Sequence, residues 1–353
     1  MSAAETFDLA LGRLLRTASE RQPATAALVE AAIGELLSGT VAPALAGAVL
    51  ASLRTRGETV DDVVGAVRAL RAQAEVVSSS RSPLVDTCGT GGDGSSTFSI
   101  STTAALVAAG AGAAVAKHGN RAATGPFGAA DVLEALGVAI DLSGAACGRC
   151  LDEVGMAFLF ARRLHPAMRF MAPVRAALGI RTLFNLIGPL TNPAGARRQV
   201  VGVSGAATLD LLAGAFEALG CDHVLVVRGQ DGIDEISLEA PTDFIELRDG
   251  VILRKETLTP DDFGLGRVKR SDLVVADAAE SAARVRAVLS GKGGPSAEVV
   301  VANAAAALYV AGRAASLREG VGLAREAIAS GRASAVLENL ISVTQREARS
   351  AGG

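Results

Sequence analysis

The period of the hydrophobic residues constrains this fold more than any other sequence feature, because it changes twice along the chain. In the middle of the chain, short β-branched runs alternate with alanine-rich stretches of helical length. The predicted strands are 84–86, 113–116, 138–142, 157–160, 199–203 and 223–227. Strands that alternate with helices are typical of a parallel sheet, since each helix carries the chain back to the start of the next strand. The pattern therefore predicts a mostly parallel α/β sheet.

Toward the amino terminus the spacing is purely helical. Residues 26–37 carry apolar side chains at helical spacing, Pro43 favours the start of a second helix, and Thr59 is a suitable N-cap for a third. A polar segment that ends at Pro83 interrupts this pattern, because a proline disfavours the helical conformation of the residue before it. The first part of the chain is thus predicted to be a helical unit that stops before the first strand.

Helical spacing returns in three stretches after residue 296. We therefore expect an α/β protein with a small all-helical N-terminal domain, residues 1–75. A larger α/β domain, residues 76–353, follows with a mostly parallel central sheet.

Charge and composition narrow the classes of function. The chain has 34 Lys and Arg against 37 Asp and Glu, and this net charge of −3 gives no electrostatic footprint for nucleic acid or an anionic membrane. The most apolar run, 100–116, is too short and too rich in polar and glycine residues to span a membrane. The four cysteines do not make a disulfide scaffold, and the amino terminus lacks the pattern of a secretory signal. We expect a cytoplasmic protein with no nucleic-acid or membrane partner.

A glycine-rich segment, Gly89–Asp93, directly follows the first predicted strand. Glycines allow close backbone approach, so successive N–H groups can point into one concavity and bind phosphate, helped by the helix that is predicted to begin near Ser99. The segment also fits the dinucleotide pattern G-x-G-x-x-G, but no acidic residue lies between Asp93 and Asp131 to bind a ribose. A flexible turn is the remaining alternative.

A second polar segment, Lys117–Arg121, follows another apolar strand. The carboxyl ends of parallel strands are where ligands bind in open α/β sheets, so these side chains are candidate ligand contacts. Residues 125–128 extend the segment into a glycine-bounded loop that could close over a ligand. The alternative interpretation is a solvated loop.

Two further segments carry charged candidates. Asp234 and Glu235 lie beyond a third apolar strand and offer the oxygen ligands that Mg²⁺ prefers, although a solvated acidic turn fits them as well. Arg169, Arg175 and Arg181 could anchor a carboxylate in two parallel hydrogen bonds, or could lie on the solvated face of a helix. A Cys-x-x-Cys pair at 147 and 150 lacks the partners of a zinc site and is interpreted as incidental.

Six segments occur here in a characteristic order. They are Gly89–Asp93, Lys117–Arg121, 130–137, His165–Arg169, 181–193 and 231–235. Taken together they strongly resemble the anthranilate phosphoribosyltransferase family. The resemblance holds in order and spacing from about residue 80 to 240 and extends more loosely over the helical ends.

The resemblance implies a nucleoside phosphorylase/phosphoribosyltransferase-like fold with hinge segments near 165–190 and a homodimer formed through the helical domain. It also implies an enzyme of tryptophan biosynthesis that transfers the phosphoribosyl group of phosphoribosyl pyrophosphate to anthranilate, with Mg²⁺ as cofactor. The expected catalytic residues are Asn120, His118 and Arg175. The expected metal ligands are Ser101, Asp234 and Glu235. The expected substrate contacts are Gly89, Thr90, Gly91, Gly92, Asp93, Ser99, Ser101, Thr102, Lys117, His118, Gly119, Asn120 and Arg175.

This chain departs from the family pattern in two places. Ser99 stands where the family usually has Asn, which shortens one expected contact, and the loop at 124–127 is stiffer and more apolar than the common serine-rich form. Two other functions are weighed against the transferase. A pyrimidine nucleoside phosphorylase should lack the Asp234 and Glu235 pair, and a non-catalytic nucleic-acid-binding paralogue should carry a basic groove.

Overall fold

The computed structural model describes residues 9–122 and 125–351. Over these residues the strands form one seven-stranded sheet in the order β3-β2-β1-β4-β5-β6-β7. The strands are β1 (Leu84–Gly89), β2 (Ala114–Gly119), β3 (Met156–Phe160), β4 (Arg198–Gly202), β5 (His223–Gly229), β6 (Thr242–Arg248) and β7 (Val251–Leu258). The first five are parallel, and β6 and β7 are antiparallel. The mostly parallel sheet predicted from the sequence is therefore confirmed.

The predicted strand at 138–142 is wrong. Val138, Ile140 and Leu142 are buried, but the segment pairs with no strand and connects two helices. Its alternation of apolar residues reflects packing alone. The β6–β7 hairpin was missed, although Asp249 and Gly250 turn with φ of 53° and 81°, which is the geometry that an Asp-Gly turn favours.

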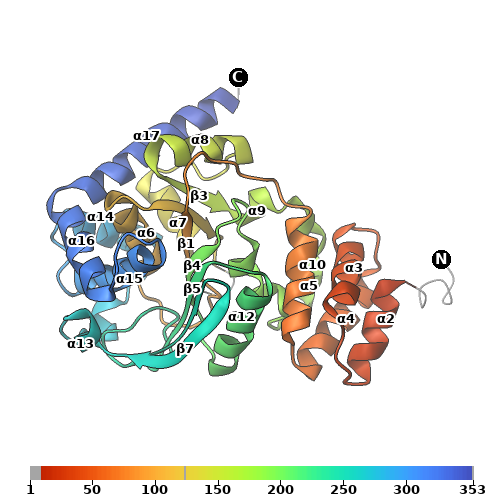
Figure 1. Ribbon diagram of the computed structural model, residues 1–353. Coiled ribbons are helices and arrows are strands. Elements are labelled where there is room, and N and C mark those ends of the chain that lie inside the picture. Colours follow the sequence, from red (N-terminus) through yellow and green to blue (C-terminus); the bar gives the residue numbers. More distant parts are fainter. Residues whose placement is uncertain (1–8, 123–124, 352–353) are drawn as a thin grey trace.

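The helices surround the sheet and also form a bundle beside it (Figure 1). The bundle comprises α2 (Ala10–Ser19), α3 (Ala26–Leu37), α4 (Pro43–Arg56) and α5 (Val60–Arg71). Around the sheet lie α6 (Ile100–Gly110), α7 (Ala129–Leu136), α8 (Gly144–Val154), α9 (Ala161–Leu164), α12 (Ala206–Ala218) and α13 (Pro260–Phe263). Two short helices, α10 (Ala172–Leu178) and α11 (Leu183–Leu186), lie against the bundle. The chain ends with α14 (Ala278–Leu289), α15 (Pro295–Val310), α16 (Leu317–Ala329) and α17 (Arg332–Ala351), and has short 3-10 turns η1 (Pro166–Phe170), η2 (Gly188–Thr191) and η3 (Arg270–Leu273).

Alternate residues of the central strands face two different cores. Val200 and Leu225 pack into the core that contains α6 and α15, whereas their neighbours Val201 and Val224 pack into the core that contains α12 and the helical bundle. Side chains of a strand point alternately to opposite faces, so a sheet that is covered on both sides needs apolar residues throughout. This explains why the sequences of the central strands are continuous runs of apolar residues.

Capping residues and a buried ion pair stabilise the helices of the bundle. The N-cap Thr59 accepts from the Asp62 amide, and the Asp62 carboxylate accepts from the Thr59 amide at 2.8 Å, which completes a capping box. The buried Asp62 carboxylate also binds Arg56 of α4, which ties two helices together. The predicted helix at 26–37 and the predicted start at Pro43 are confirmed.

The segment 166–191 packs against this bundle. Val174 of α10 and Leu183 of α11 share a core with Val63 and Leu70 of α5. The same segment also closes over the carboxyl edge of the sheet, where its residues line a cavity with residues of the sheet loops. It therefore bridges the bundle and the sheet.

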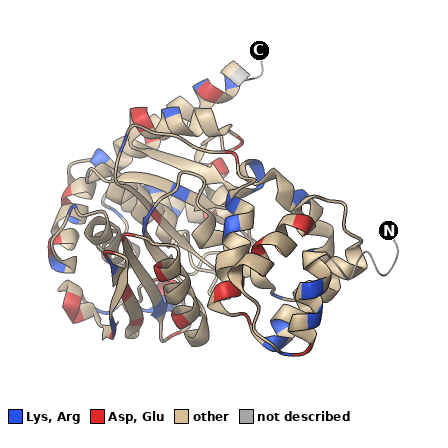
Figure 2. Cartoon of the chain, turned by 45° about the vertical axis from the view of Figure 1, so that its right-hand side comes forward, with Lys and Arg blue, Asp and Glu red and all other residues tan. Residues whose placement is uncertain are grey.

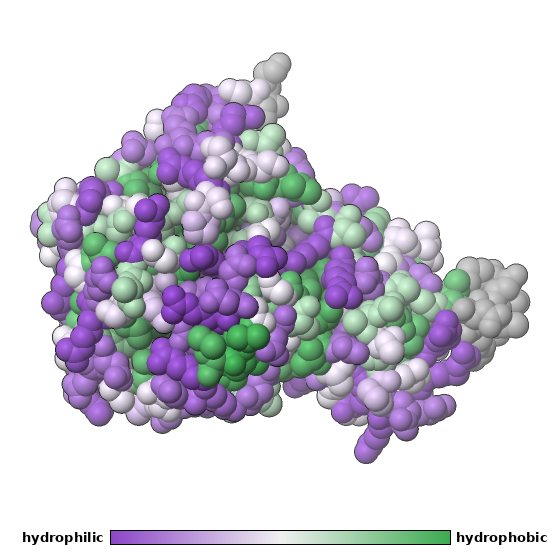
Figure 3. All heavy atoms as spheres, viewed as in Figure 1, coloured by the Kyte–Doolittle hydropathy of each residue, from purple (hydrophilic) through white to green (hydrophobic). Residues whose placement is uncertain are grey.

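The strand β7 forms the open edge of the sheet. Its side chains Val251, Ile252 and Leu253 are exposed, and Figure 3 shows a compact apolar patch where Figure 1 places this strand. Among the described helices, none has both the length and the apolar character that crossing a membrane requires.

Candidate active site

A large cavity, with a volume of about 980 Å³, lies at the carboxyl ends of the parallel strands. Strand order changes direction between β1 and β4, because β1 continues to β2 on one side while β4 continues to β5 on the other. Loops diverge at such a point and leave a crevice, where ligands of open α/β sheets bind. The opposite wall comes from 161–191 and from Leu70 of α5.

The structure brings nearly all the predicted residues into this cavity. Those that line it are Gly89, Thr90, Gly91, Gly92, Asp93, Ser99, Ser101, Lys117, His118, Gly119, Asn120, Arg175, Asp234 and Glu235. Thr102 does not line it, because its side chain is fully buried and its hydroxyl accepts a hydrogen bond from Ser99 at 2.7 Å. The loop residues Gly125, Pro126 and Phe127 also line the cavity, whereas Thr124 lies outside the described residues.

The glycine loop has the backbone conformation that the sequence predicts. Gly91 and Gly92 have φ of 63° and 78°, in the left-handed region that glycine adopts without strain. Arg181 braces the loop, since its guanidinium donates to the Gly91 carbonyl at 2.8 Å and to the Thr90 carbonyl at 3.3 Å. A side chain on Gly92 would collide with this guanidinium, because a Cβ there would lie 1.9 Å from Nη1 of Arg181. Glycine at this position thus permits the brace.

The carboxylates of Asp234 and Glu235 meet the glycine loop and the start of α6. The Gly91 amide donates to Asp234 at 3.0 Å, and the Ser101 amide donates to Glu235 at 3.1 Å. Burial and the neighbouring Asp93 raise the pKa of Asp234 to about 7, and burial together with Asp234 raises the pKa of Glu235 to about 8. The raised pKa values show that nearby positive charge does not fully compensate these clustered acids, and a divalent cation would supply more.

Lys117 lies beneath the cavity floor. Its side chain is only 2% exposed, and its ammonium group donates to the Thr87 carbonyl and to the Ser101 hydroxyl, the latter at 3.3 Å. Its positive charge also lowers the pKa of Glu235, against the larger effect of burial. The lysine therefore provides fixed positive charge between β1 and the start of α6, near Glu235.

Two buried histidines stand side by side in the wall. The rings of His118 and His165 lie 5.2 Å apart, and burial lowers the pKa of His118 to about 3 and the pKa of His165 to about 4. Nδ1 of His118 lies 3.1 Å from the Gly188 carbonyl oxygen, which can only accept, so Nδ1 carries the proton. Nε2 of His118 is then an acceptor, and it has no partner among the described residues.

Arg175 and Asn120 line the cavity and have few hydrogen-bond partners among the described residues. The Arg175 guanidinium lies 6.0 Å from the centre of the Phe184 ring and forms no hydrogen bond or ion pair with the described residues. Burial lowers its pKa. Asn120 is exposed at the end of β2, and its side-chain oxygen accepts from the Arg121 amide at 2.8 Å. A half-buried guanidinium without an anion is a ready partner for a carboxylate.

The comparisons with known proteins agree over almost the whole chain. Residues 81–334 match the family model "Glycosyl transferase family, a/b domain", and residues 12–74 match "Glycosyl transferase family, helical bundle domain". The anthranilate phosphoribosyltransferase of Symbiobacterium thermophilum is 50% identical over 333 residues, which cover 94% of this chain and 97% of the relative. That of Rubrobacter xylanophilus is 50% identical over 95% of this chain and 98% of the relative.

This chain belongs to the anthranilate phosphoribosyltransferase family. Solved structures support the same assignment. The enzyme from Thermus thermophilus matches with a TM-score of 0.89 and 43% identity over 94% of this chain and 99% of that chain. The enzyme from Saccharomyces cerevisiae, solved "in complex with PRPP and Mg", matches with a TM-score of 0.88 and 26% identity over 98% of this chain and 99% of that chain.

Membership in this family makes the chain a glycosyltransferase that transfers a pentosyl group. The two other functions weighed from the sequence, nucleoside phosphorolysis and nucleic-acid binding without catalysis, receive no support. Figure 2 shows basic and acidic residues interspersed over both the bundle and the sheet part, with no continuous basic stripe in that view. Such a surface offers no extended track for a phosphate backbone.

One polar network beside this cavity was missed from the sequence. The buried Asp86 carboxylate accepts from the His118 amide at 3.0 Å and from the Asn192 amide group at 2.8 Å, and Asn192 also donates to the Ala116 carbonyl. Burial raises the pKa of Asp86 to about 6. The acidic Asp86 inside an apolar strand could have indicated a buried polar contact from the sequence. Its partner Asn192 lies 106 residues away, and no sequence pattern connects the two.

Proposed function

We propose that this chain joins anthranilate to the phosphoribosyl group of phosphoribosyl pyrophosphate at this cavity, giving N-(5-phosphoribosyl)anthranilate and pyrophosphate in tryptophan biosynthesis. The observation that carries the proposal is the convergence of the glycine loop, the acid pair and the free guanidinium of Arg175 on one cavity. The Saccharomyces cerevisiae enzyme, solved in complex with PRPP and Mg and in complex with 4-fluoroanthranilate, supports the same pair of substrates.

The diphosphate end of the donor would lie against the glycine loop. The backbone amides of Gly92, Asp93 and Thr102 form no hydrogen bond with the described residues and can donate to phosphate oxygens in the glycine loop and at the amino end of α6. Lys117 would add fixed positive charge from below, and Arg181 would hold the loop in shape. Ser99 and Ser101 lie at the start of α6, where their hydroxyls can reach a ribose or phosphate oxygen. Thr102 would act through Ser99, since its own side chain is buried.

The residues fit Mg²⁺ as a cofactor. Asp234 and Glu235 are oxygen ligands on the cavity wall, and Ser101 contributes a hydroxyl beside them. Among the described residues no cluster of three acidic, histidine or cysteine side chains could hold a metal alone. This matches Mg²⁺, which commonly takes one or two carboxylates and completes its shell with water and substrate phosphate. The chemistry that Mg²⁺ supplies when bound is electrostatic stabilisation of the leaving diphosphate.

The acceptor would be oriented by the opposite wall. Arg175 would bind the anthranilate carboxylate through its planar guanidinium. His118, whose Nδ1 proton is held by the Gly188 carbonyl, would form part of the wall beside the acceptor, and Asn120 would lie between the two substrates. Burial keeps His118 uncharged at neutral pH, so it does not repel the positive charge that develops on the ribose.

The step needs placement more than covalent chemistry. The nitrogen lone pair of the amine forms a bond to C1 of the ribose while the bond from C1 to the diphosphate oxygen breaks and its electrons leave with the diphosphate. The amine is already neutral at pH 7, so no obligatory base is required, and its surplus proton leaves after the new bond has formed. The protein contributes by alignment and by stabilising the leaving charge.

The assay is the fall in anthranilate fluorescence on addition of phosphoribosyl pyrophosphate, with and without Mg²⁺. We expect a fall that depends on all three components. Phosphorolysis of thymidine in place of this reaction would contradict the proposal. In an Asn120→Ala variant we expect a steep loss of turnover with unchanged substrate affinity, and unchanged turnover would refute a positioning role for Asn120.

We further propose that the domain boundary lies at residues 75 and 76 and that the 165–190 segment acts as a hinge. A homodimer through the helical domain is supported by exposed apolar side chains of that domain, Leu9, and of the 165–190 segment that packs against it, Phe170 and Ile180. Light scattering of the purified protein should give twice the chain mass, and a Phe170→Glu variant should give the monomer; a monomeric wild type would refute the dimer. Cytoplasmic location stays a prediction, supported by four cysteines that are free thiols.

A further inference from the structure

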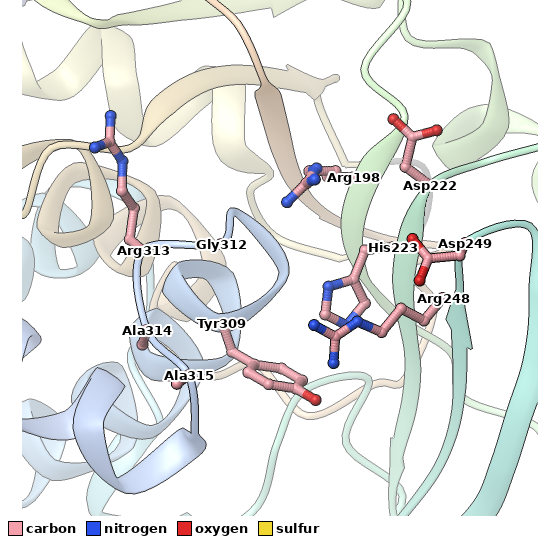
Figure 4. Close-up of a pocket in the computed structure, with 10 residues that line it drawn as sticks. All are labelled: Arg198, Asp222, His223, Arg248, Asp249, Tyr309, Gly312, Arg313, Ala314 and Ala315. Atoms are coloured by element: carbon pink, nitrogen blue, oxygen red, sulfur yellow. The ribbon is translucent and has the colours of Figure 1, made fainter.

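A second cavity, of about 300 Å³, lies at the opposite edge of the sheet from the site described above. It is formed where β4 and β5 begin and where β6 ends, and the chain that follows α15 closes it (Figure 4). The two cavities share no lining residue. Strands β4 and β5 run between them, so a ligand here would not compete with substrates at the carboxyl edge.

Two arginines give this pocket a positive charge that the protein leaves uncompensated. The Arg198 guanidinium is held in place by a 3.0 Å hydrogen bond to the Val310 carbonyl, while its Nε is buried and has no acceptor among the described residues. Arg248 is exposed at the end of β6. Neither forms an ion pair with a described carboxylate. In Figure 4 both side chains extend into the pocket, whereas the Arg313 side chain points away from it.

The acidic groups near the pocket are mostly occupied by other partners. Asp222 accepts from Arg197 at 2.8 Å. Glu246, behind the wall, accepts from the Tyr309 hydroxyl at 2.8 Å and from Arg254 at 2.6 Å, and lies 2.9 Å from Nε2 of His223. Asp249 at the rim is the only lining carboxylate of the described residues without such a partner. The positive charge of the two guanidinium groups therefore dominates the interior.

The remaining walls suit a small ligand. His223 and Tyr309 meet edge to face with ring centres 4.9 Å apart and provide an aromatic wall. Gly312, with φ of 73°, leaves the space beside Arg198 open, since a Cβ there would lie 3.0 Å from its Nη1. A volume of about 300 Å³ is at the small end of ligand sites. It accommodates a phosphate group with a single ring or short chain.

We propose that this pocket binds the phosphate group of a small metabolite between Arg198 and Arg248. Guanidinium forks match phosphate oxygens in parallel hydrogen bonds, and two such cations balance a dianion better than a single carboxylate. The site lies outside the proposed transferase site and does not depend on it.

The chain carries its own reporter for this pocket, because it has no Trp and Tyr309 is its single Tyr. Inorganic phosphate titrated at constant ionic strength should change the tyrosine fluorescence of the wild type in a saturable way. The matched control Arg325→Ala removes a guanidinium on exposed α16 and should respond as the wild type does. Arg248→Ala should bind phosphate at least about tenfold more weakly, the order of effect of one charged hydrogen bond.

Arg248→Lys separates the shape of the guanidinium from its charge. It keeps the charge but loses the fork, and we expect weaker binding than in the wild type and tighter binding than in Arg248→Ala. Circular dichroism identical to the wild type confirms that each variant is folded. No saturable response in the wild type, a response reproduced by sodium chloride, or equal affinity in Arg248→Ala would overturn the proposal.

Discussion

Mg²⁺ binding to the substrate-free protein should be strongly dependent on pH, because a protonated carboxyl is a poor metal ligand. Burial and the neighbouring Asp93 raise the pKa of Asp234, and burial and the neighbouring Asp234 raise the pKa of Glu235, so the folded protein holds part of these protons at neutral pH. Raising the pH above neutrality frees the ligands. Release of about one proton for each Mg²⁺ bound corresponds to about a tenfold change of apparent affinity for each pH unit.

The apparent affinity for Mg²⁺ should therefore rise about tenfold from pH 7 to pH 8 and level off above pH 9. Isothermal titration calorimetry without substrate measures this directly, and buffers of different ionisation enthalpy report the protons released on binding. Glu235→Gln should lose most of the affinity and most of the pH dependence. The matched control Glu338→Gln, the same change on exposed α17, should behave as the wild type does. An affinity that is constant between pH 6 and pH 8 would refute the reasoning.

Three substitutions test other parts of the account. Arg175→Ala should raise the KM for anthranilate by about 10- to 100-fold and leave the KM for phosphoribosyl pyrophosphate unchanged in steady-state kinetics, since one charged hydrogen bond contributes about 1.5–3 kcal/mol; equal effects on both substrates would contradict its role. Gly202→Ala places a Cβ 1.5 Å from the Asp234 carbonyl oxygen and should lower kcat about 100-fold by displacing the acid pair, whereas Gly322→Ala on α16, with no atom within 4 Å, should retain full activity. Asp62→Ala removes the capping box and leaves Arg56 buried without its partner, so urea denaturation should show a loss of about 3–5 kcal/mol; a loss below about 1 kcal/mol would show that the pair is dispensable.

The helices and strands that could be predicted from the sequence are those determined by residues close together in the chain. The helix at 26–37 follows from apolar spacing, and the helix after Thr59 follows from its cap. The central strands follow from apolar runs that two covered faces require. The error at 138–142 has a physical cause as well, because a buried connection between helices carries the same alternation as a strand.

The location of the site could be predicted because the carboxyl ends of parallel strands meet at one edge. The glycine loop, the segment after β2 and the acid pair therefore had to lie close together. The brace from Arg181 to the glycine loop and the link from Asn192 to Asp86 could not be predicted in this way. Both join residues about 90 to 106 positions apart, and contacts at that separation leave no periodic pattern in one sequence.

The central claim is that the glycine loop and the acid pair bind the same diphosphate. Crystals grown with phosphoribosyl pyrophosphate and Mn²⁺, used as an anomalous scatterer in place of Mg²⁺, test it most directly. The account predicts an anomalous peak beside Asp234 and Glu235, in contact with a diphosphate that receives hydrogen bonds from the glycine-loop amides of Gly92 and Asp93. A diphosphate bound elsewhere, or a metal site away from both carboxylates, would contradict it.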